Sequence, residues 1–237
     1  MRKEVFSFNH IEVLSEIPVN LNLEKVLKRL KVSDRQQKEQ IGSIKKLVQL
    51  AGNLIAAKAA YKVSYVEDKK DARVSIEEVE FESKVLRKNL EKIGKVFPYI
   101  ITIGKDLENR ATSANDLLEQ FYLEEIADLA LEHTLKKLQT YLQQKYRPGR
   151  LSRMSPGSLK DWPITEQRKL FSLFGDTQKI VGVSLTDSYL MIPRKSISGI
   201  LFPTEINFYS CKLCPRERCE RRKAPYDPKL KESYNLG

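Results

Sequence analysis

The stretch SLTDSYLMIPRKSISGILF, residues 184–202, carries the clearest β-sheet signal of the chain. Its apolar and β-branched residues fall into two groups separated by polar ones, so we predict two strands joined around residues 187–191. A second stretch, VFPYIITIG at residues 96–104, is almost continuously apolar and β-branched. Such a run is typical of a strand that is buried on both faces of a sheet. A sheet with a buried central strand is therefore expected in the second half of the chain.

Helical spacing of apolar residues dominates the remaining sequence. Residues 106–146 contain no Gly or Pro and predict two helices with a break near 112–115. Further helices are expected at 23–30, at 41–61 with Ser33 or Asp34 as the cap, at 83–93 with Ser83 as the cap and Gly94 at the end, and at 165–175. Short strands are expected at 5–8, 60–67 and 73–83, the last two as a hairpin. Residues 147–163 form the least regular stretch, and long irregular segments in compact domains often carry function.

Composition and net charge indicate the kind of protein and the kind of partner to expect. The 237 residues are 41% hydrophobic and 31% charged, which is typical of a globular chain with its own core. The formal net charge of +11 favours an anionic partner, such as nucleic acid, an acidic protein surface or a phosphate-bearing cofactor. The amino-terminal residues lack the apolar segment of a signal peptide, and no run is apolar enough to span a bilayer. We therefore expect a cytoplasmic protein in a reducing compartment, with no membrane partner.

All three cysteines of the chain lie in FYSCKLCPRERCERR, residues 208–222. Cys211, Cys214 and Cys219 have C-x2-C-x4-C spacing, and the two-residue gap lets two thiolates reach one metal. Zinc or an iron–sulfur cluster is the expected metal. No His or Cys follows Cys219, so a fourth ligand would come from elsewhere or one iron would stay open. Free thiols in a docking tail are the alternative.

Two stretches together carry a family resemblance. They are RMSPGSLKDWPITEQRKLFSLFG at residues 153–175 and the opening stretch, and they resemble the activation domain of cobalamin-dependent methionine synthase. The family's second block is matched here by Leu185, Thr186, Asp187, Ser188, Met191, Pro193, Ser196, Ile197, Ser198 and Gly199. The similarity covers about residues 96–209. The chain resembles stand-alone forms of this domain that carry a cysteine cluster at the carboxyl end.

The resemblance implies an α+β fold, with a twisted, mainly antiparallel sheet flanked by helices and a binding loop across one face. It also implies an organisation along the chain. Residues 1–95 would be the amino-terminal portion of the domain, 96–210 its core resembling the activation domain, and 211–237 a basic, cysteine-rich extension.

The resemblance also implies a function. The domain would bind S-adenosylmethionine and dock on a cobalamin-binding module whose cobalt has become inactive Co(II). A flavodoxin or ferredoxin would supply an electron, and the methyl group of S-adenosylmethionine would trap the Co(I) formed. The chain would thus be a methyltransferase-type activation subunit for methionine synthase, and so for methionine biosynthesis, or for a related corrinoid methyltransferase, and would act only with its cobalamin partner. No residue of its own is expected to be catalytic.

The same resemblance selects the residues that would bind S-adenosylmethionine: Arg153, Ser155, Pro156, Gly157, Ser158, Glu132 and Tyr209. Residue chemistry agrees, because the forked guanidinium of Arg153 suits a carboxylate. A Pro-Gly turn brings backbone close to a ligand, and Glu132 could bind the amine or a ribose hydroxyl. Ser158 stands where the family usually has tyrosine. Without the resemblance, Arg153 could equally form a surface ion pair and Glu132 could be solvated.

Two other functions remain open from the sequence. The +11 charge and the cysteine spacing also fit a basic nucleic-acid-binding module with a zinc-ribbon-like tail. That hypothesis leaves the Pro-Gly loop and the 184–199 block unexplained. In a third alternative, the chain keeps the fold but has lost S-adenosylmethionine binding, and serves as a scaffold that carries an iron–sulfur electron relay.

Overall fold

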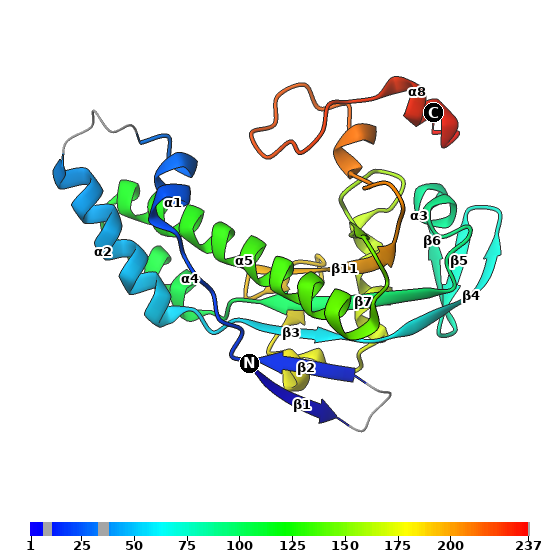
Figure 1. Cartoon of the computed structure of the whole chain (residues 1–237), viewed down its shortest axis with the longest axis horizontal. Coiled ribbons are helices and arrows are strands. Elements are labelled where there is room, and N and C mark those ends of the chain that lie inside the picture. The colour runs from blue at the N-terminus through cyan, green and yellow to red at the C-terminus, as the bar shows by residue number, and fades with distance from the viewer. Residues whose placement is uncertain (7–10, 33–37, 237) are drawn as a thin grey trace.

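The computed structural model describes residues 1–6, 11–32 and 38–236, and shows a twisted sheet with helices on both faces (Figure 1). The sheet order is β1-β2-β3-β7-β4-β5-β6, with β11 on the other side of β7 and β8 beyond β11. All of the strand pairs are antiparallel in the described part of the chain. The predicted fold class, α+β with a mainly antiparallel sheet flanked by helices, is confirmed.

The bounds of the sheet strands are β1 Arg2–Phe6, β2 Ile11–Ser15, β3 Lys58–Tyr61, β4 Ser64–Lys70, β5 Arg73–Ile76, β6 Val79–Glu82, β7 Lys95–Thr102, β8 Leu151–Met154 and β11 Ser196–Pro203. A separate two-stranded hairpin consists of β9 Ser184–Leu185 and β10 Met191–Ile192. The helices are α1 Leu23–Arg29, α2 Lys38–Leu54, α3 Lys84–Asn89, α4 Asp106–Thr112, α5 Leu117–Tyr146, α6 Gln167–Ser172, α7 Thr177–Val181 and α8 Pro228–Ser233. Two 3-10 helices span Ile164–Glu166 and Ser210–Leu213.

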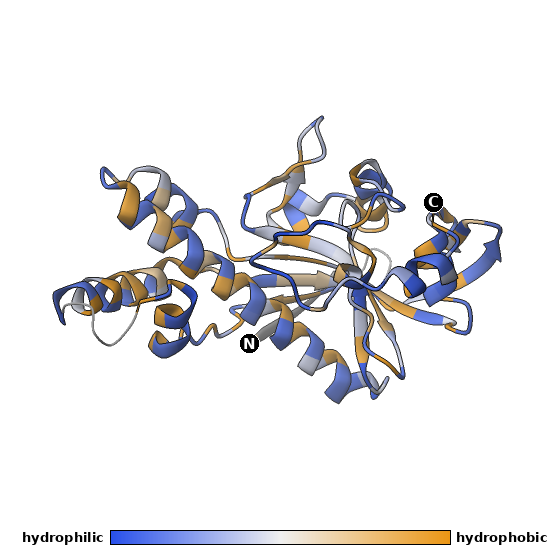
Figure 2. Ribbon diagram, turned by 90° about the horizontal axis from the view of Figure 1, so that it is seen from above, coloured by the Kyte–Doolittle hydropathy of each residue, from blue (hydrophilic) through white to orange (hydrophobic). Residues whose placement is uncertain are grey.

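The sheet separates two hydrophobic cores. On one face, α5 runs over the sheet with α1, α2 and α4 beside it (Figure 1). The other core gathers Val96 and Ile100 of β7 with Trp162 and with α3, α6 and α7. In Figure 2 the helices alternate hydrophobic and hydrophilic residues, as expected for helices that bury one side. No helix among the described residues is long and apolar enough to cross a membrane.

Several predicted elements are confirmed. Strand β7 is buried from its second residue onward and pairs with β3, β4 and β11. Helices α4 and α5 break at residues 113–116, where the Asp116 carboxylate accepts a hydrogen bond from the Leu118 amide and caps α5. Ser83 caps α3 through the Leu86 amide, and β4 and β5 form the expected hairpin.

Other predictions are wrong in extent. Helix α2 ends at Leu54 instead of 61, because residues 58–61 form β3, which fills the gap between β2 and β7. Alanine has the highest intrinsic helix propensity, but such propensities are small and pairing within the sheet overrides them here. Helix α3 ends at Asn89, before Gly94. The irregular stretch contains strand β8, and residues 177–202 contain α7 and three strands instead of two. Ser33, Asp34 and the end of the expected strand at 5–8 lie outside the described residues.

Candidate functional site

A cleft of about 920 Å³ lies between α5 and the β8–β11 edge of the sheet. Helix α5 and the segment before and within α1 form one wall, β8 and β11 form the floor, and residues 207–214 form the opposite wall. Most of the residues predicted to bind a ligand line this cleft: Glu132, Arg153, Ser155, Ser158, Tyr209, Cys211 and Cys214. Pro156, Gly157 and Cys219 are not among its lining residues. The irregular stretch and the cysteine segment, whose nearest ends are 45 positions apart in the sequence, therefore meet at one site.

Arg153 lies on β8, opposite Leu201 of β11, on the side of the sheet that faces α5. Its side chain is half-buried, and it makes no hydrogen bond or ion pair with any described residue. A guanidinium with its donors free in a partly buried cleft is prepared for a forked contact with a carboxylate. The alternative of a surface ion pair has no partner among the described residues.

The predicted Pro-Gly turn spans Ser155 to Ser158 at the end of β8. The Ser158 amide donates to the Ser155 carbonyl at 3.1 Å, and Gly157 has φ of +79°, as a type II turn requires at its third residue. The Gly157 amide donates to the Trp162 carbonyl at 2.7 Å, which anchors the turn to the buried Trp162. The Ser158 hydroxyl donates to the Ser155 carbonyl at 2.6 Å, so this side chain stabilises the turn itself.

Gly199 of β11 lies directly beneath this turn. A Cβ atom added there would lie 2.4 Å from the Met154 carbonyl oxygen and 2.6 Å from the Ser155 hydroxyl oxygen. The Ser155 hydroxyl donates to the Ser198 carbonyl at 2.7 Å and fixes the turn to β11. Gly199 is thus required for the close approach of the two strands, which is a structural role.

Tyr209 stands on the wall opposite α5. The buried Ser152 hydroxyl accepts a hydrogen bond from the Phe208 amide at 2.8 Å, which ties this segment to β8 next to Arg153. Tyr209 itself is 37% exposed, and its carbonyl accepts from the Lys212 amide in the first turn of the 3-10 helix. The ring therefore lies at the mouth of the cleft, where it can contact both a bound ligand and solvent.

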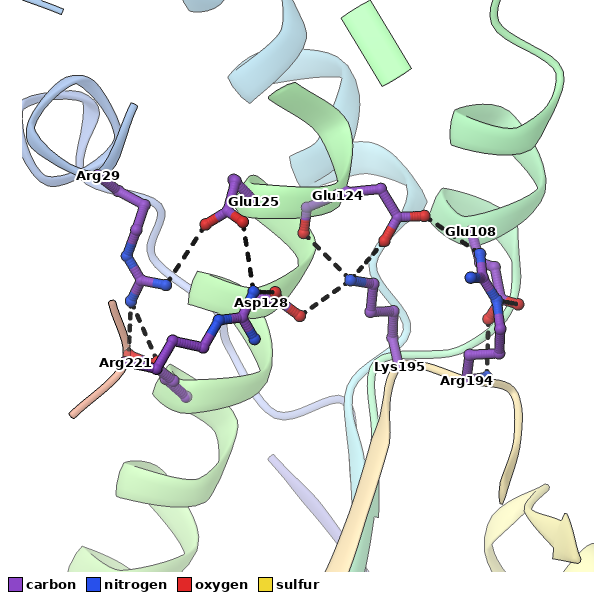
Figure 3. A network of polar contacts seen from close by, with 9 residues as sticks. Arg29, Glu108, Glu124, Glu125, Asp128, Arg194, Lys195 and Arg221 are labelled. Atoms are coloured by element: carbon purple, nitrogen blue, oxygen red, sulfur yellow. Dashed lines mark hydrogen bonds and ion pairs between the residues drawn. The ribbon is translucent and has the colours of Figure 1, made fainter. Parts of the chain in front are cut away.

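Ion pairs connect α5 to three other parts of the chain (Figure 3). Arg29 of α1 binds Glu132 at 3.1 Å and Glu125 at 3.5 Å. Arg221 of the extension binds Glu125 at 3.3 Å and also contacts Asp128. Just before β11, Lys195 binds Asp128 at 2.9 Å, and Arg194 continues the network to Glu124 and Glu108. The network holds α1, β11 and the carboxyl-terminal extension around the cleft.

The network changes the expected role of Glu132. Both of its carboxylate oxygens accept hydrogen bonds from the same Arg29 nitrogen at 3.1 Å. Glu132 lines the cleft, as expected, but its charge is already neutralised by Arg29. A ligand amine would have to share this carboxylate with the guanidinium.

His133 marks the α1 end of the cleft. Its Nδ1 accepts a hydrogen bond from the Asn20 amide at 3.0 Å, so the neutral ring carries its proton on Nε2. Partial burial lowers the pKa of His133, and the positive charges of Lys137, Lys25 and Lys136 lower it further. This end of the cleft is therefore rich in positive charge while the imidazole stays neutral.

The three cysteines do not come together. Cys211 and Cys214 are half-buried in the cleft wall, whereas Cys219 is exposed and outside it. Among the described residues, no group of three His, Cys, Asp or Glu side chains could hold a metal ion. The residues as placed therefore do not fit a three-thiolate zinc or iron–sulfur site. Metal binding by Cys211, Cys214 and Cys219 stays a prediction that would need a different arrangement of these thiols or ligands from outside the described residues.

The comparisons with known proteins agree with this geometry. The sequence profile of the family described as vitamin B12 dependent methionine synthase, activation domain, matches residues 99–224, just over half of the chain. The chain belongs to this family. The match begins within β7 and ends beyond Cys219, so every residue predicted for the site lies inside it.

The solved structures support the fold. A crystal structure of the MetH reactivation domain bound to AdoHcy superposes with a TM-score of 0.60, over 98% of this chain and 92% of that one. The two sequences are 14% identical, so this comparison shows that the two chains share a fold and nothing beyond the fold. No curated protein matches the sequence significantly.

Sequence reasoning missed one wall of the cleft. Asn20 and Lys25 line it from the segment before and within α1, His133 lines it from α5, and Arg221 lines it from the extension. One signal was present, because Glu125, Asp128 and Glu132 have the spacing i, i+3, i+7 and share one face of a helix. Three carboxylates on one face of α5 indicate that cations from elsewhere pack against it.

Proposed function

We propose that this activation-domain family member binds S-adenosylmethionine in the cleft and presents its methyl group to a corrinoid protein. The observation that carries the proposal is the Arg153 guanidinium. It is half-buried in the cleft and free of protein partners among the described residues, next to a turn that matches the family motif. The AdoHcy bound to the neighbouring reactivation domain supports the same ligand class, since AdoHcy is the demethylated form of S-adenosylmethionine.

The other lining groups suit the rest of this ligand. The turn from Ser155 to Ser158 brings backbone close to the cleft, where hydrogen bonds to the amino acid or ribose portions can form. Leu129 and Ile197 offer apolar contacts for the purine. The Tyr209 ring at the mouth suits the sulfonium, because a cation is attracted to an aromatic face. The sulfonium methyl group would then lie at the open side, where a partner can reach it.

The chemistry at that open side requires a second protein. One electron, from a flavodoxin or ferredoxin, would reduce cob(II)alamin on the partner to cob(I)alamin. Its electron pair would then attack the methyl carbon, and the sulfur would leave with the bonding electrons as S-adenosylhomocysteine. The chain would thus bind and orient the methyl donor, and would supply no acid, base or nucleophile.

Calorimetric titration of the full chain with S-adenosylmethionine tests the binding step. Arg153→Ala removes a charge-assisted contact of about 1.5–3 kcal/mol, which corresponds to a loss of affinity of roughly 10- to 150-fold. Lys160→Ala is the matched control. It removes one positive charge from the same loop, outside the cleft, where Lys160 is exposed and has no partner among the described residues. A flat titration of the wild-type protein, or equal losses in both variants, would contradict the proposal.

A further inference from the structure

Cys211 and Cys214 occupy the two ends of one hydrogen-bonded turn. The Cys214 amide donates to the Cys211 carbonyl at 3.3 Å, at the end of the 3-10 helix Ser210–Leu213. The first and fourth residues of such a turn have Cα atoms less than about 7 Å apart. A disulfide requires Cα atoms roughly 4.4–6.8 Å apart, so the backbone brings this pair to a separation that a disulfide can span.

The two thiols also face the same space. Cys211 and Cys214 both line the cleft and are half-buried, so their side chains point into one solvent-connected volume. Cys219 is exposed and is not among the lining residues. The structure therefore separates one pair from the third cysteine, although the sequence spacing groups all three.

The surroundings of the turn hold it in place without a metal. The Arg222 guanidinium donates to the Cys211 carbonyl at 3.1 Å and to the Cys214 carbonyl at 3.4 Å. The Lys223 amide donates to the Cys211 sulfur at 3.4 Å. An N–H donor at the sulfur stabilises the negative charge that forms when the thiol reacts or when the disulfide is opened. With two thiols and no third ligand in the described residues, redox chemistry suits this pair better than metal coordination.

We propose that Cys211 and Cys214 are a reversible dithiol–disulfide pair, and thus a redox modification site in the cleft wall. The oxidant is a low-molecular-weight disulfide. One protein thiolate attacks this disulfide and releases one small thiol, and the second protein thiolate attacks the mixed disulfide and releases the other. Two electrons pass from the protein to the reagent, and the two protons of the protein thiols end on the two small thiols.

The pair is coupled to the ligand site through Tyr209. The Lys212 amide donates to the Tyr209 carbonyl at 2.9 Å, so a turn that begins at Tyr209 overlaps the Cys211–Cys214 turn that a disulfide would close. Bridging the turn would restrict the position of this ring. The expected change in S-adenosylmethionine affinity rests on the proposed function, whereas formation of the disulfide does not.

The test uses the full chain, reduced and treated with a chelator, then equilibrated in buffers of reduced and oxidised glutathione. After acid quenching, free thiols are alkylated with N-ethylmaleimide and the protein is analysed by intact mass and peptide mapping. The expected result is a reversible change from three alkylated cysteines to one, with Cys219 as the labelled residue. Cys219→Ser should keep the transition, and Cys211→Ser and Cys214→Ser should each abolish it, with folding checked by urea denaturation.

Three outcomes overturn the pair: alkylation of all three cysteines at every glutathione ratio, a disulfide that includes Cys219, or a stoichiometric metal that protects the thiols before chelation. Calorimetry of the oxidised and reduced protein then separates the two proposals. Equal S-adenosylmethionine affinity in both states overturns the coupling through Tyr209. No binding in either state overturns the proposed function, while the mapped disulfide still stands.

Discussion

Replacing Gly199 with alanine should destabilise the protein and displace the binding turn. The added Cβ would lie 2.4 Å from the Met154 carbonyl oxygen, 2.6 Å from the Ser155 hydroxyl oxygen and 3.1 Å from the Tyr99 hydroxyl oxygen. The carbonyl belongs to the backbone of β8 and cannot rotate away, so β8 must separate from β11. Overpacking of this kind costs about 1–3 kcal/mol, and the backbone clash places the change near the upper end, at about 2–3 kcal/mol.

Urea denaturation followed by the fluorescence of Trp162, the only tryptophan of the chain, measures this change. The Trp162 carbonyl accepts a hydrogen bond from the Gly157 amide, so the fluorescence of Trp162 also reports on the turn. Gly42→Ala in the exposed part of α2 is the control. A Cβ there meets nothing within 4 Å, and the same substitution should stabilise the helix by about 0.5–1 kcal/mol. If Gly199→Ala were as stable as the wild type, the close approach of β8 and β11 would be refuted.

Three further predictions concern the cleft walls. Because the pKa of His133 is lower in the folded than in the unfolded protein, the free energy of unfolding should fall as the pH drops through the ordinary value of 6.5, and His133→Gln should flatten this dependence in urea titrations. Ser152→Ala leaves the Phe208 amide without its acceptor, which should cost about 1–3 kcal/mol and speed hydrogen exchange at that amide. Arg221→Ala should make residues 215–223 more sensitive to limited proteolysis, whereas Arg218→Ala, exposed and without a partner among the described residues, should not.

The sequence predicted elements best where their signals are local. Ser83 precedes α3 by one residue and bonds to an amide of its first turn, so the cap could be recognised from neighbouring residues alone. Residues 58–61 are the opposite case. Their alanines favour a helix, but the residues form β3 because β2 and β7 leave room for one strand between them. That requirement comes from partners 38 to 49 positions away, so the local pattern alone does not show where α2 ends and β3 begins.

The same difference between local and distant signals applies to the parts of the cleft. Its floor was predictable, because Arg153, the Pro-Gly turn and Gly199 form contiguous motifs whose contacts run between two paired strands. The opposite wall depends on which cation meets the carboxylates of α5. Arg29 pairs with Glu132 across 103 positions and Arg221 with Asp128 across 93. With 42 lysines and arginines in the chain, a carboxylate stripe predicts that cations will bind there but does not select them. The selection is made by α1 and the extension packing on α5, and it determines that Glu132 enters the cleft already paired.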